Sequence, residues 1–324
     1  MTPAIEINKP SLDNLPSNYL ISLSDYASIS LSGEEQSKYL QGQVTCDVNT
    51  LDQQPVLHGA HCNAKGKVFS CFRLFNREGK HLLLQPKSTI EASLAELKKF
   101  GVFAKVDISI TDEIEVIALV GEDASELIRN NFSLVPDSLS PVVHSDSTTL
   151  VYIAGKVERF LVIDSPNKLH TIINKFTLPV FESSIWHLLE IVEGIPALIS
   201  KNNNEYVPQM LNMQAINGIS FTKGCYLGQE TVARMQYLGK NKKALFALSG
   251  ETPQKLDNVV IEKQLGENWR KAGDVTCVYQ ADDGKSYFQA VLNNDIDSTT
   301  HLRIKDHPET SLSIIELPYT LIQE

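Results

Sequence analysis

The spacing of strand-like segments changes near Gly239, and this change restricts the possible folds more than any other feature of the sequence. Beyond that point, short strand-like runs recur about every ten to fifteen residues with turn residues between them. Many short strands at such spacing are typical of a small all-β barrel or sandwich. The sequence therefore predicts two parts, residues 1–238 and a C-terminal β-barrel at residues 239–324. The five predicted barrel strands are 244–249, 274–279, 287–292, 301–304 and 311–317.

Residues 1–238 show the patterns of mixed α and β structure. The clearest predicted helix is 88–100, where apolar residues recur on one face and a glycine follows the last turn. Strand-like segments at 56–62 and 67–75 enclose a hairpin turn, and a further strand is expected at 102–110. This succession of strands around a helix predicts an α+β fold with antiparallel pairing.

A second helix is expected after Ser32. Ser32 and Glu35 have the spacing of a capping box, in which each side chain bonds a backbone N–H of the first turn. The helix would run to about Leu40.

Charge and hydropathy limit the partners and the location of the chain. The formal net charge is −10 and the sequence pI is about 5.3, so a broad nucleic-acid-binding surface is not expected. Any contact with RNA would be indirect or confined to a small patch. No basic segment leads an apolar core at the N-terminus, and the most apolar run, 114–120, is too short to span a bilayer. The cytoplasm is the expected location, without membrane contact.

Five cysteines stand at widely spaced positions, 46, 62, 71, 225 and 277. Their odd number and the lack of a Cys-x-x-Cys pair argue against a disulfide framework and against a zinc or iron–sulfur site. No metal site is predicted. Glycine-rich nucleotide-binding motifs, the Gly-x-Ser-x-Gly elbow and the His-Glu-x-x-His motif are also missing, so nucleotide-dependent and hydrolase functions lose their usual support.

One cysteine has surroundings that favour reactivity. Cys225 lies in Lys223-Gly224-Cys225-Tyr226-Leu227-Gly228, just ahead of a segment able to begin a helix. A neighbouring cation and a helix N-terminus both lower the pKa of a thiol. The alternative is a buried structural cysteine, which is what most free cysteines are. The residues alone leave these two interpretations about equal.

The segment 217–234 closely resembles the signature of the YgfZ family, folate-binding relatives of the glycine-cleavage T-protein (aminomethyltransferase). Its central residues are Lys223-Gly224-Cys225-Tyr226 and Gly228-Gln229-Glu230. The resemblance covers nearly the whole chain and includes 39–45, 61–67, 96–100, 266–270 and 317–319. Several separate motifs in the same order make a chance match improbable.

This resemblance implies both a fold and a function. The implied fold has two intertwined α+β domains and a C-terminal β-barrel, arranged around a central channel that receives tetrahydrofolate or another reduced folate. The implied role is in the modification (thiolation) of some tRNAs through maintenance of iron–sulfur enzymes, with a link to the control of replication initiation. Folate and those enzymes are thus the implied partners.

The resemblance also points to particular residues. Tyr26 and Trp186 match the aromatic positions of the folate site, although the first is usually Trp in the relatives. A flat ring gains about 1 kcal/mol by stacking on such a side chain. Lys223 and Arg234 flank the motif and are candidates to bind a folate glutamate tail. Core packing for Trp186 and solvent exposure for the two cations are the alternatives.

The segment after Lys67 departs from the T-protein pattern. T-proteins carry acidic residues there, whereas this chain has Ser70-Cys71 and no carboxylate. Neither side chain can act as a carboxylate base, so a stand-alone aminomethyltransferase is not expected. The preferred hypothesis is a folate-binding accessory protein with Cys225 as a reactive thiol. The alternatives are a folate-dependent aminomethyltransferase or demethylase of the T-protein type, and a tRNA-binding module.

Overall fold

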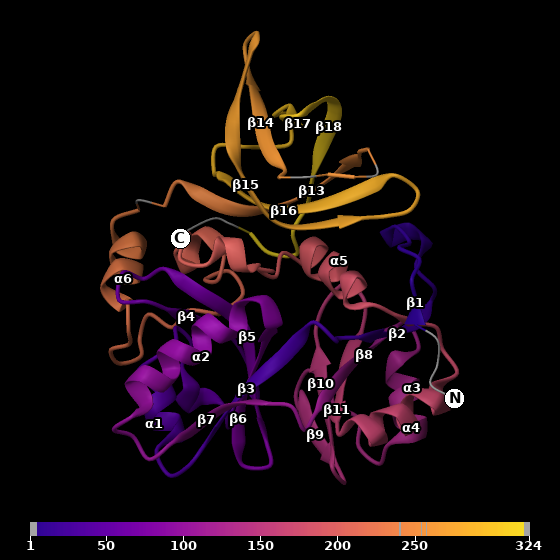
Figure 1. Ribbon diagram of the computed structural model, residues 1–324, viewed down its shortest axis with the longest axis vertical. Coiled ribbons are helices and arrows are strands. Elements are labelled where there is room, and N and C mark those ends of the chain that lie inside the picture. Colours follow the sequence, from indigo (N-terminus) through magenta and orange to yellow (C-terminus); the bar gives the residue numbers. More distant parts are fainter. Residues whose placement is uncertain (1–4, 240, 254, 257, 321–324) are drawn as a thin grey trace.

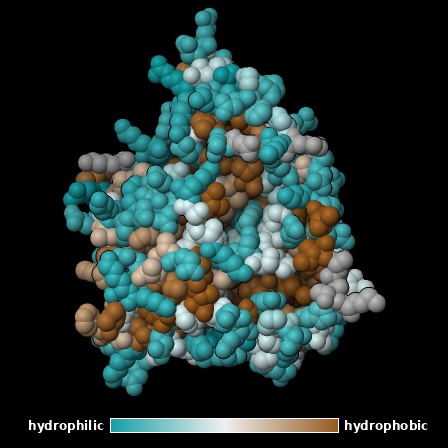
Figure 2. Space-filling view, viewed as in Figure 1, coloured by the Kyte–Doolittle hydropathy of each residue, from teal (hydrophilic) through white to brown (hydrophobic). Residues whose placement is uncertain are grey.

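The computed structural model describes residues 5–239, 241–253, 255–256 and 258–320. Two sheet-and-helix lobes lie side by side, and a β-barrel stands above them (Figure 1). Figure 2 shows hydrophilic residues over the tip of the barrel and hydrophobic residues gathered lower on the same face. No helix in the described part of the chain is both long enough and apolar enough to cross a membrane.

The first lobe is a seven-stranded sheet with strand order β1-β12-β2-β8-β11-β10-β9. Its central strand β8 is buried on both faces: Val116, Ala118 and Val120 face one apolar cluster, whereas Ile117 and Leu119 face another. Helices α3 and α4 lie on one side of the sheet and α5 on the other (Figure 1). The bounds are β1 Ile5–Glu6, β2 Asn18–Ser22, β8 Glu115–Gly121, α3 Ala124–Asn131, β9 Val142–Ser145, β10 Thr148–Ile153, β11 Arg159–Asp164, α4 Pro166–Phe176, β12 Val180–Phe181 and α5 Ser183–Glu193.

The second lobe is a five-stranded antiparallel sheet with strand order β4-β5-β6-β3-β7. Helices α1 and α2 cover one of its faces, and Ile90 and Leu97 of α2 are buried against it. The chain leaves the first sheet after β2, builds this whole lobe, and returns to pair β8 with β2. The two lobes are therefore intertwined. The bounds are β3 Tyr26–Ser32, α1 Gln36–Gln41, β4 Val56–Cys62, β5 Val68–Arg77, β6 Lys80–Pro86, α2 Lys87–Gly101 and β7 Asp107–Thr111.

The C-terminal strands close into a barrel in the order β13-β16-β15-β14-β17-β18. The prediction of an α+β fold with a C-terminal barrel is confirmed. Helix α5 packs beneath the barrel against β15 and β16, so it lies between the barrel and the first lobe. The bounds are α6 Gln229–Tyr237, β13 Lys243–Glu251, β14 Val260–Leu265, β15 Asn268–Gln280, β16 Lys285–Asn293, β17 Leu302–Ile304 and β18 His307–Ile315.

Three local predictions were wrong. Ser32 does not cap a helix, because it continues β3 and pairs with Asp107, and α1 begins only at Gln36 without a side-chain cap. The strand expected at 102–110 is β7, which begins at Asp107; residues 102–106 are not extended. The barrel prediction missed strand β14 altogether.

An N-terminal segment ties the lobes to the barrel. The Lys9 backbone N–H donates to the Asp282 carboxylate at 2.7 Å, and the Leu12 N–H donates to the Tyr287 hydroxyl at 3.2 Å. The Tyr279 hydroxyl in turn donates to the Pro10 carbonyl at 2.7 Å. The N-terminal segment thus holds the barrel through both backbone and side-chain groups.

Candidate functional site

Two of the sequence motifs pack backbone against backbone. Gly228 has a φ of +84°, and a Cβ at this position would lie 2.5 Å from the Asn63 carbonyl oxygen and 2.8 Å from the Cα of Gly66. A Cβ on Gly66 would likewise meet Thr231 at 2.9 Å. The hairpin tip 63–67 therefore rests directly on the start of α6, and only glycine allows this approach. Close packing accounts for both glycines.

A third motif, residues 39–45, contacts the segment that leads into α6. The Leu227 N–H donates to the Gly42 carbonyl at 3.0 Å, and the Ser220 N–H donates to the Thr45 carbonyl at 2.9 Å. The Thr45 hydroxyl donates to the Gly218 carbonyl at 2.6 Å. Two segments far from residue 225 in the sequence, 39–45 and 63–67, thus support the loop that carries Cys225.

Lys223 holds this loop in place through buried hydrogen bonds. Its side chain is buried, and its Nζ donates to the carbonyls of Val44 at 2.8 Å and Cys46 at 2.6 Å. The same Nζ lies 5.1 Å from the centre of the Tyr226 ring, within cation–π distance. Burial lowers the pKa of Lys223 to about 8, so the ammonium form still predominates at neutral pH. Lys223 is a structural cation here, directed at main-chain carbonyls.

Cys225 is the exposed cysteine of the five. Burial raises the pKa of Cys46, Cys71 and Cys277 to about 12, and it raises the pKa of Cys62 as well. Those four thiols stay protonated and shielded. Cys225 follows Gly224, where a Cβ would meet nothing within 4 Å, and it precedes the first turn of α6. It is the thiol open to a partner or reagent.

A second candidate region is a small cavity where the two lobes meet beneath the barrel. Its volume is about 20 Å³, room for about one water molecule. Its polar lining comes from β3, β4, β5 and α5, and its apolar lining includes Met213 and Ile216 from a segment between elements. The polar lining residues are Tyr26, His58, Cys71, Arg73 and Glu190.

An ion network with two cations and one anion borders this cavity. Arg73 donates to both carboxylate oxygens of Glu190 at 2.8 and 2.9 Å, and Arg159 donates to one of them at 3.1 Å. Both guanidinium groups lie over the Trp186 ring, at 5.3 and 5.0 Å from its centre. Burial and the two guanidinium groups lower the pKa of His58 to about 3, so this imidazole is neutral. The Trp186 Nε1–H has no partner among the described residues.

The four residues expected to bind folate separate into different places. Tyr26 lines the cavity, whereas Trp186 is fully buried behind Arg73 and Glu190 and does not line it. Lys223 lies under the Cys225 loop, and Arg234 pairs with Glu230 at 2.8 Å on the outer face of α6. Neither cation lines the cavity. Only Tyr26 therefore lies where a ligand in the cavity would touch it.

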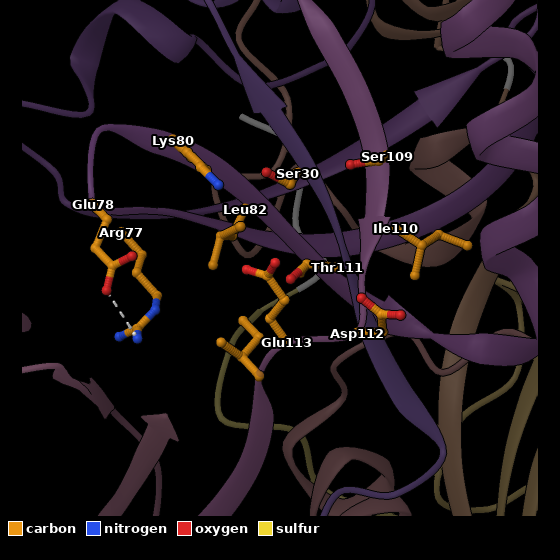
Figure 3. A pocket seen from close by; sticks show the side chains of 11 residues that line it. Ser30, Arg77, Glu78, Lys80, Leu82, Ser109, Ile110, Thr111, Asp112 and Glu113 are labelled. Carbon is orange, nitrogen blue, oxygen red and sulfur yellow. Dashed lines mark ion pairs between the residues drawn. The ribbon is translucent and has the colours of Figure 1, made fainter. Parts of the chain in front are cut away.

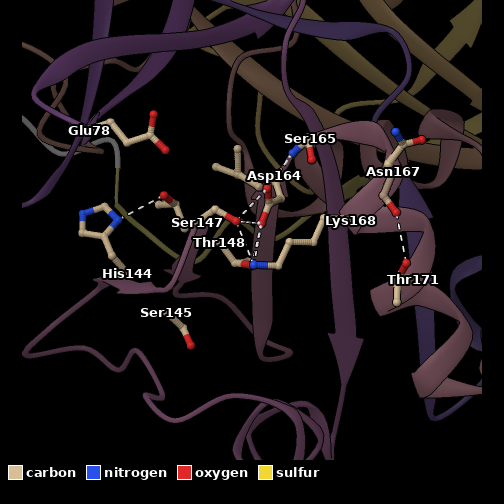
Figure 4. Close-up of polar contacts among 12 residues, drawn as sticks. Glu78, His144, Ser145, Ser147, Thr148, Asp164, Ser165, Asn167, Lys168 and Thr171 are labelled. Carbon is tan, nitrogen blue, oxygen red and sulfur yellow. Dashed lines mark hydrogen bonds and ion pairs between the residues drawn. The ribbon is translucent and has the colours of Figure 1, made fainter.

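Two other polar regions lie away from both candidates. Figure 3 shows a groove of about 150 Å³ whose lining includes Arg77, Glu78 and Glu113. In Figure 4, the Asp164 carboxylate accepts hydrogen bonds from Ser147 and Thr148 at the start of α4, and Lys168 donates to Ser147 at 2.7 Å. Lys168 is also 3.6 Å from Asp164, and a paired ammonium cannot act as a base for Ser147. The described residues contain no cluster of His, Cys, Asp or Glu able to hold a metal ion.

Comparisons with known proteins identify the family. The chain is 59% identical over its full length to the tRNA-modifying protein YgfZ of Colwellia psychrerythraea, and all of that protein is covered. The chain belongs to the YgfZ family. The protein of the same name from Aliivibrio fischeri is 41% identical, with 99% of this chain and 98% of that one covered. A family model described as "YgfZ, beta-barrel domain" matches residues 241–307.

The YgfZ architecture extends to a solved structure of another protein. The glycine cleavage system aminomethyltransferase T from Bartonella henselae matches with a TM-score of 0.72, over 95% of this chain and 87% of that one. Sequence identity is 13%, so this likeness concerns the fold. It confirms the expected T-protein-like arrangement.

The central ion network of this YgfZ chain was not predicted from the sequence. Arg73 stands among the apolar residues Phe72 and Leu74 of β5, and Glu190 stands in the apolar run Leu188–Val192 of α5. A charge within an apolar run is a usable signal, because charged residues are almost never fully buried unless they are paired. The pairing itself joins residues 117 apart in the sequence, which no local pattern reveals.

Proposed function

We propose that this YgfZ-family chain is an accessory protein in tRNA modification and that Cys225 is its reactive group. The observation that carries the proposal is that segments 39–45 and 61–67 both pack against segment 217–230, which carries one exposed thiol. The full-length relatives bear the name tRNA-modifying protein, which supports the same role. We further propose that the thiol acts in the maintenance of iron–sulfur enzymes that thiolate tRNA.

Replacing Cys225 tests this proposal. A Cys225→Ser variant, expressed in cells lacking the native protein, should lose tRNA thiolation while its thermal unfolding is unchanged, because the side chain is exposed. Thiolated nucleosides are measured by mass spectrometry after digestion of total tRNA. Cys277→Ser is the matched control: it makes the same atomic change at a buried barrel position and should retain thiolation. Normal thiolation in the Cys225→Ser strain would contradict the proposal.

We also propose that the cavity between the lobes binds a reduced folate. The lining chemistry suits a pterin: Tyr26 offers an aromatic face, Glu190 accepts N–H donors, and Arg73 donates to carbonyl oxygens. The present volume of about 20 Å³ is far too small for such a ring. Met213 and Ile216 must therefore move, and a flexible Met side chain in a segment between elements can do so. A bound tetrahydrofolate would supply one-carbon or redox chemistry within reach of these side chains.

Tryptophan fluorescence tests folate binding. Only Trp186 and Trp269 are present, so a Trp269→Phe variant leaves Trp186 as the reporter beside the ion network. Titration with tetrahydrofolate should quench its emission to saturation. Tyr26→Ala should weaken binding about tenfold through loss of stacking and contact area, and Tyr26→Trp should retain it. Tyr237→Ala, at an exposed aromatic position on α6, is the control and should leave folate affinity unchanged. A fluorescence signal that does not change up to saturating folate, together with no retention of folate in dialysis, would contradict the proposal.

The aminomethyltransferase alternative has less support. Among the described residues that line the cavity, Glu190 is the one carboxylate, and two guanidinium groups bind it. Its two oxygens already accept three hydrogen bonds from these groups. Ser70 faces the buried side of the sheet beneath α2, and Cys71 faces the cavity as a protonated thiol. If the purified protein released formaldehyde from N-methyl amines in a tetrahydrofolate-dependent reaction, that result would establish this alternative.

A further inference from the structure

Positive charge is concentrated in one part of an acidic chain. The formal net charge of the protein is −10, yet residues 223–243 contain five basic residues and one acidic residue. Lys223 is buried and engaged with main-chain carbonyls, but Arg234 and Lys242 are exposed and Lys243 is half-buried. The surface around α6 therefore differs in sign from the chain as a whole.

The hairpin tip adds two cations to this surface. Gly66 lies against Thr231 of α6, and Arg234 follows Thr231 by three residues and so shares its helix face. Lys65 is exposed at the hairpin tip, and Lys67 is half-buried, with its Nζ 2.8 Å from the Glu205 main-chain carbonyl. These cations lie beside the first turns of α6.

The start of the barrel lies on the other side of α6. The Asn241 side chain donates to the Gln209 carbonyl at 3.2 Å, and the Gln209 side chain donates to the Val232 carbonyl of α6 at 2.6 Å. Lys242 and Lys243 follow directly. Figure 1 shows α6 at the outer edge of the molecule, beside the tip of the β4–β5 hairpin and below the chain that enters β13. We call Lys65, Lys67, Arg234, Lys242 and Lys243 the basic surface.

Acidic side chains within these segments are few, and an aromatic ring is present. Glu230 is paired with Arg234 at 2.8 Å, and Glu205, whose main-chain carbonyl accepts from Lys67, is exposed. Tyr237, near the end of α6, is 73% exposed, and Leu238 next to it is 56% exposed. Large side chains at such exposure contribute little to the fold. Cations around an exposed aromatic ring are the pattern that binds phosphates together with an unstacked base.

We propose that the basic surface binds the phosphate backbone of tRNA and that the Tyr237 ring stacks on an unpaired base. The inference rests on the proposed role in tRNA modification and adds direct contact with the RNA. The negative charge of the remaining surface repels RNA, so binding is confined to this side of the molecule. Cys225 precedes α6 by four residues and is exposed, so the docked RNA lies on the element that follows the reactive loop.

Salt-dependent binding tests this inference. The full chain is titrated into a fluorescently labelled, unmodified tRNA transcript, and anisotropy is followed from about 50 to 200 mM salt. The triple variant Lys65→Glu, Arg234→Glu and Lys242→Glu should lose at least about tenfold in affinity. Its slope of log affinity against log salt should fall by about 2 to 3, since each lost phosphate contact removes roughly 0.7–0.9. Tyr237→Ala should weaken binding about tenfold without changing the slope.

A matched control separates this surface from net charge. The triple variant Lys80→Glu, Lys98→Glu and Lys175→Glu changes the net charge equally at exposed positions in β6, α2 and α4. It should bind tRNA like the wild type. Equal losses of tRNA affinity in the two triple variants would overturn the inference. A wild-type protein that binds poly-glutamate but not tRNA would also overturn it and would indicate an acidic protein partner.

The outcome remains separable from that of the proposed function. If Cys225→Ser leaves tRNA thiolation intact in cells while the basic surface binds tRNA in vitro, the proposed role fails and the RNA surface stands. If the basic-surface variant binds tRNA as tightly as the wild type while Cys225→Ser abolishes thiolation, the RNA surface fails and the proposed role stands.

Discussion

His61 should make the stability of the protein sensitive to acid. Its side chain is fully buried, Nδ1 is 2.9 Å from the Ser93 hydroxyl of α2, and Nε2 has no partner among the described residues. Burial lowers the pKa of His61 to about 3. A neutral imidazole is therefore required in the folded protein, whereas the unfolded chain takes up a proton near pH 6.5.

The sign and size of the effect follow from this difference. Below pH 6.5 the unfolded state binds more protons than the folded state, so the free energy of unfolding falls as the pH is lowered. Each pH unit costs about 1.4 kcal/mol, which gives a loss of about 2 kcal/mol between pH 7.5 and pH 5 from His61 alone. The contribution is fully present above pH 6.5 and continues to decline toward pH 3. His58, whose pKa is also lowered to about 3, adds a loss of the same sign.

Urea unfolding of a His61→Gln variant measures the contribution. Glutamine can keep a hydrogen bond to Ser93 and does not titrate. The variant should lose about 2 kcal/mol less than the wild type between pH 7.5 and pH 5. His301→Gln, at an exposed barrel position, is the control and should keep the pH dependence of the wild type. Identical pH dependence in the wild type and the His61→Gln variant would show that His61 is not responsible for the loss of stability in acid.

Three further substitutions, the first with a matched control, test the contacts described above. Gly228→Ala should cost more than about 2 kcal/mol in urea unfolding, because a Cβ would lie 2.5 Å from the Asn63 carbonyl at a left-handed φ, whereas Gly224→Ala, with open space around it, should be neutral. Lys223→Met should lower the free energy of unfolding by about 2 kcal/mol, because two carbonyls lose their donor. It should also raise the rate of Cys225 alkylation by iodoacetamide, and an unchanged rate would show that Lys223 does not hold the loop. Glu190→Gln should lower the free energy of unfolding by about 3–5 kcal/mol, since two buried guanidinium groups lose their counter-ion, and a change below about 1 kcal/mol would contradict the buried network.

The sequence predicted features that depend on local patterns. The barrel followed from strand spacing, and the hairpin over 56–75 followed from two apolar runs around a turn. Strand β14 was missed because Glu262 and Lys263 interrupt its apolar alternation. In the structure Glu262 pairs with Arg303 across the sheet at 2.9 Å, so a charge that broke the pattern is satisfied by a neighbouring strand.

The candidate site was only partly predictable, for the same physical reason. The glycines of the Cys225 motif indicated a close backbone approach, but nothing local showed that residues 63–67 are the approaching segment. Lys223 was expected beside the thiol or a ligand, yet its burial directs the ammonium to carbonyls near Cys46. Trp186 stands in a helix that is apolar on several faces, and only the tertiary structure shows that two arginines cover its ring.

The bonds between the N-terminal segment and the barrel have a consequence for biosynthesis. Asp282 lies 273 residues after Lys9, and Tyr287 lies 275 residues after Leu12. During translation the segment around Lys9 cannot bond to Asp282 and Tyr287 until these residues have left the ribosome. Contacts between residues so far apart in the sequence form late, because the entropic cost of closing the long loop comes before the contacts stabilise the chain. The nascent chain therefore leaves residues 9–12 without these bonds until β15 and β16 are made, although the flanking strands β1 and β2 can pair with β12 earlier.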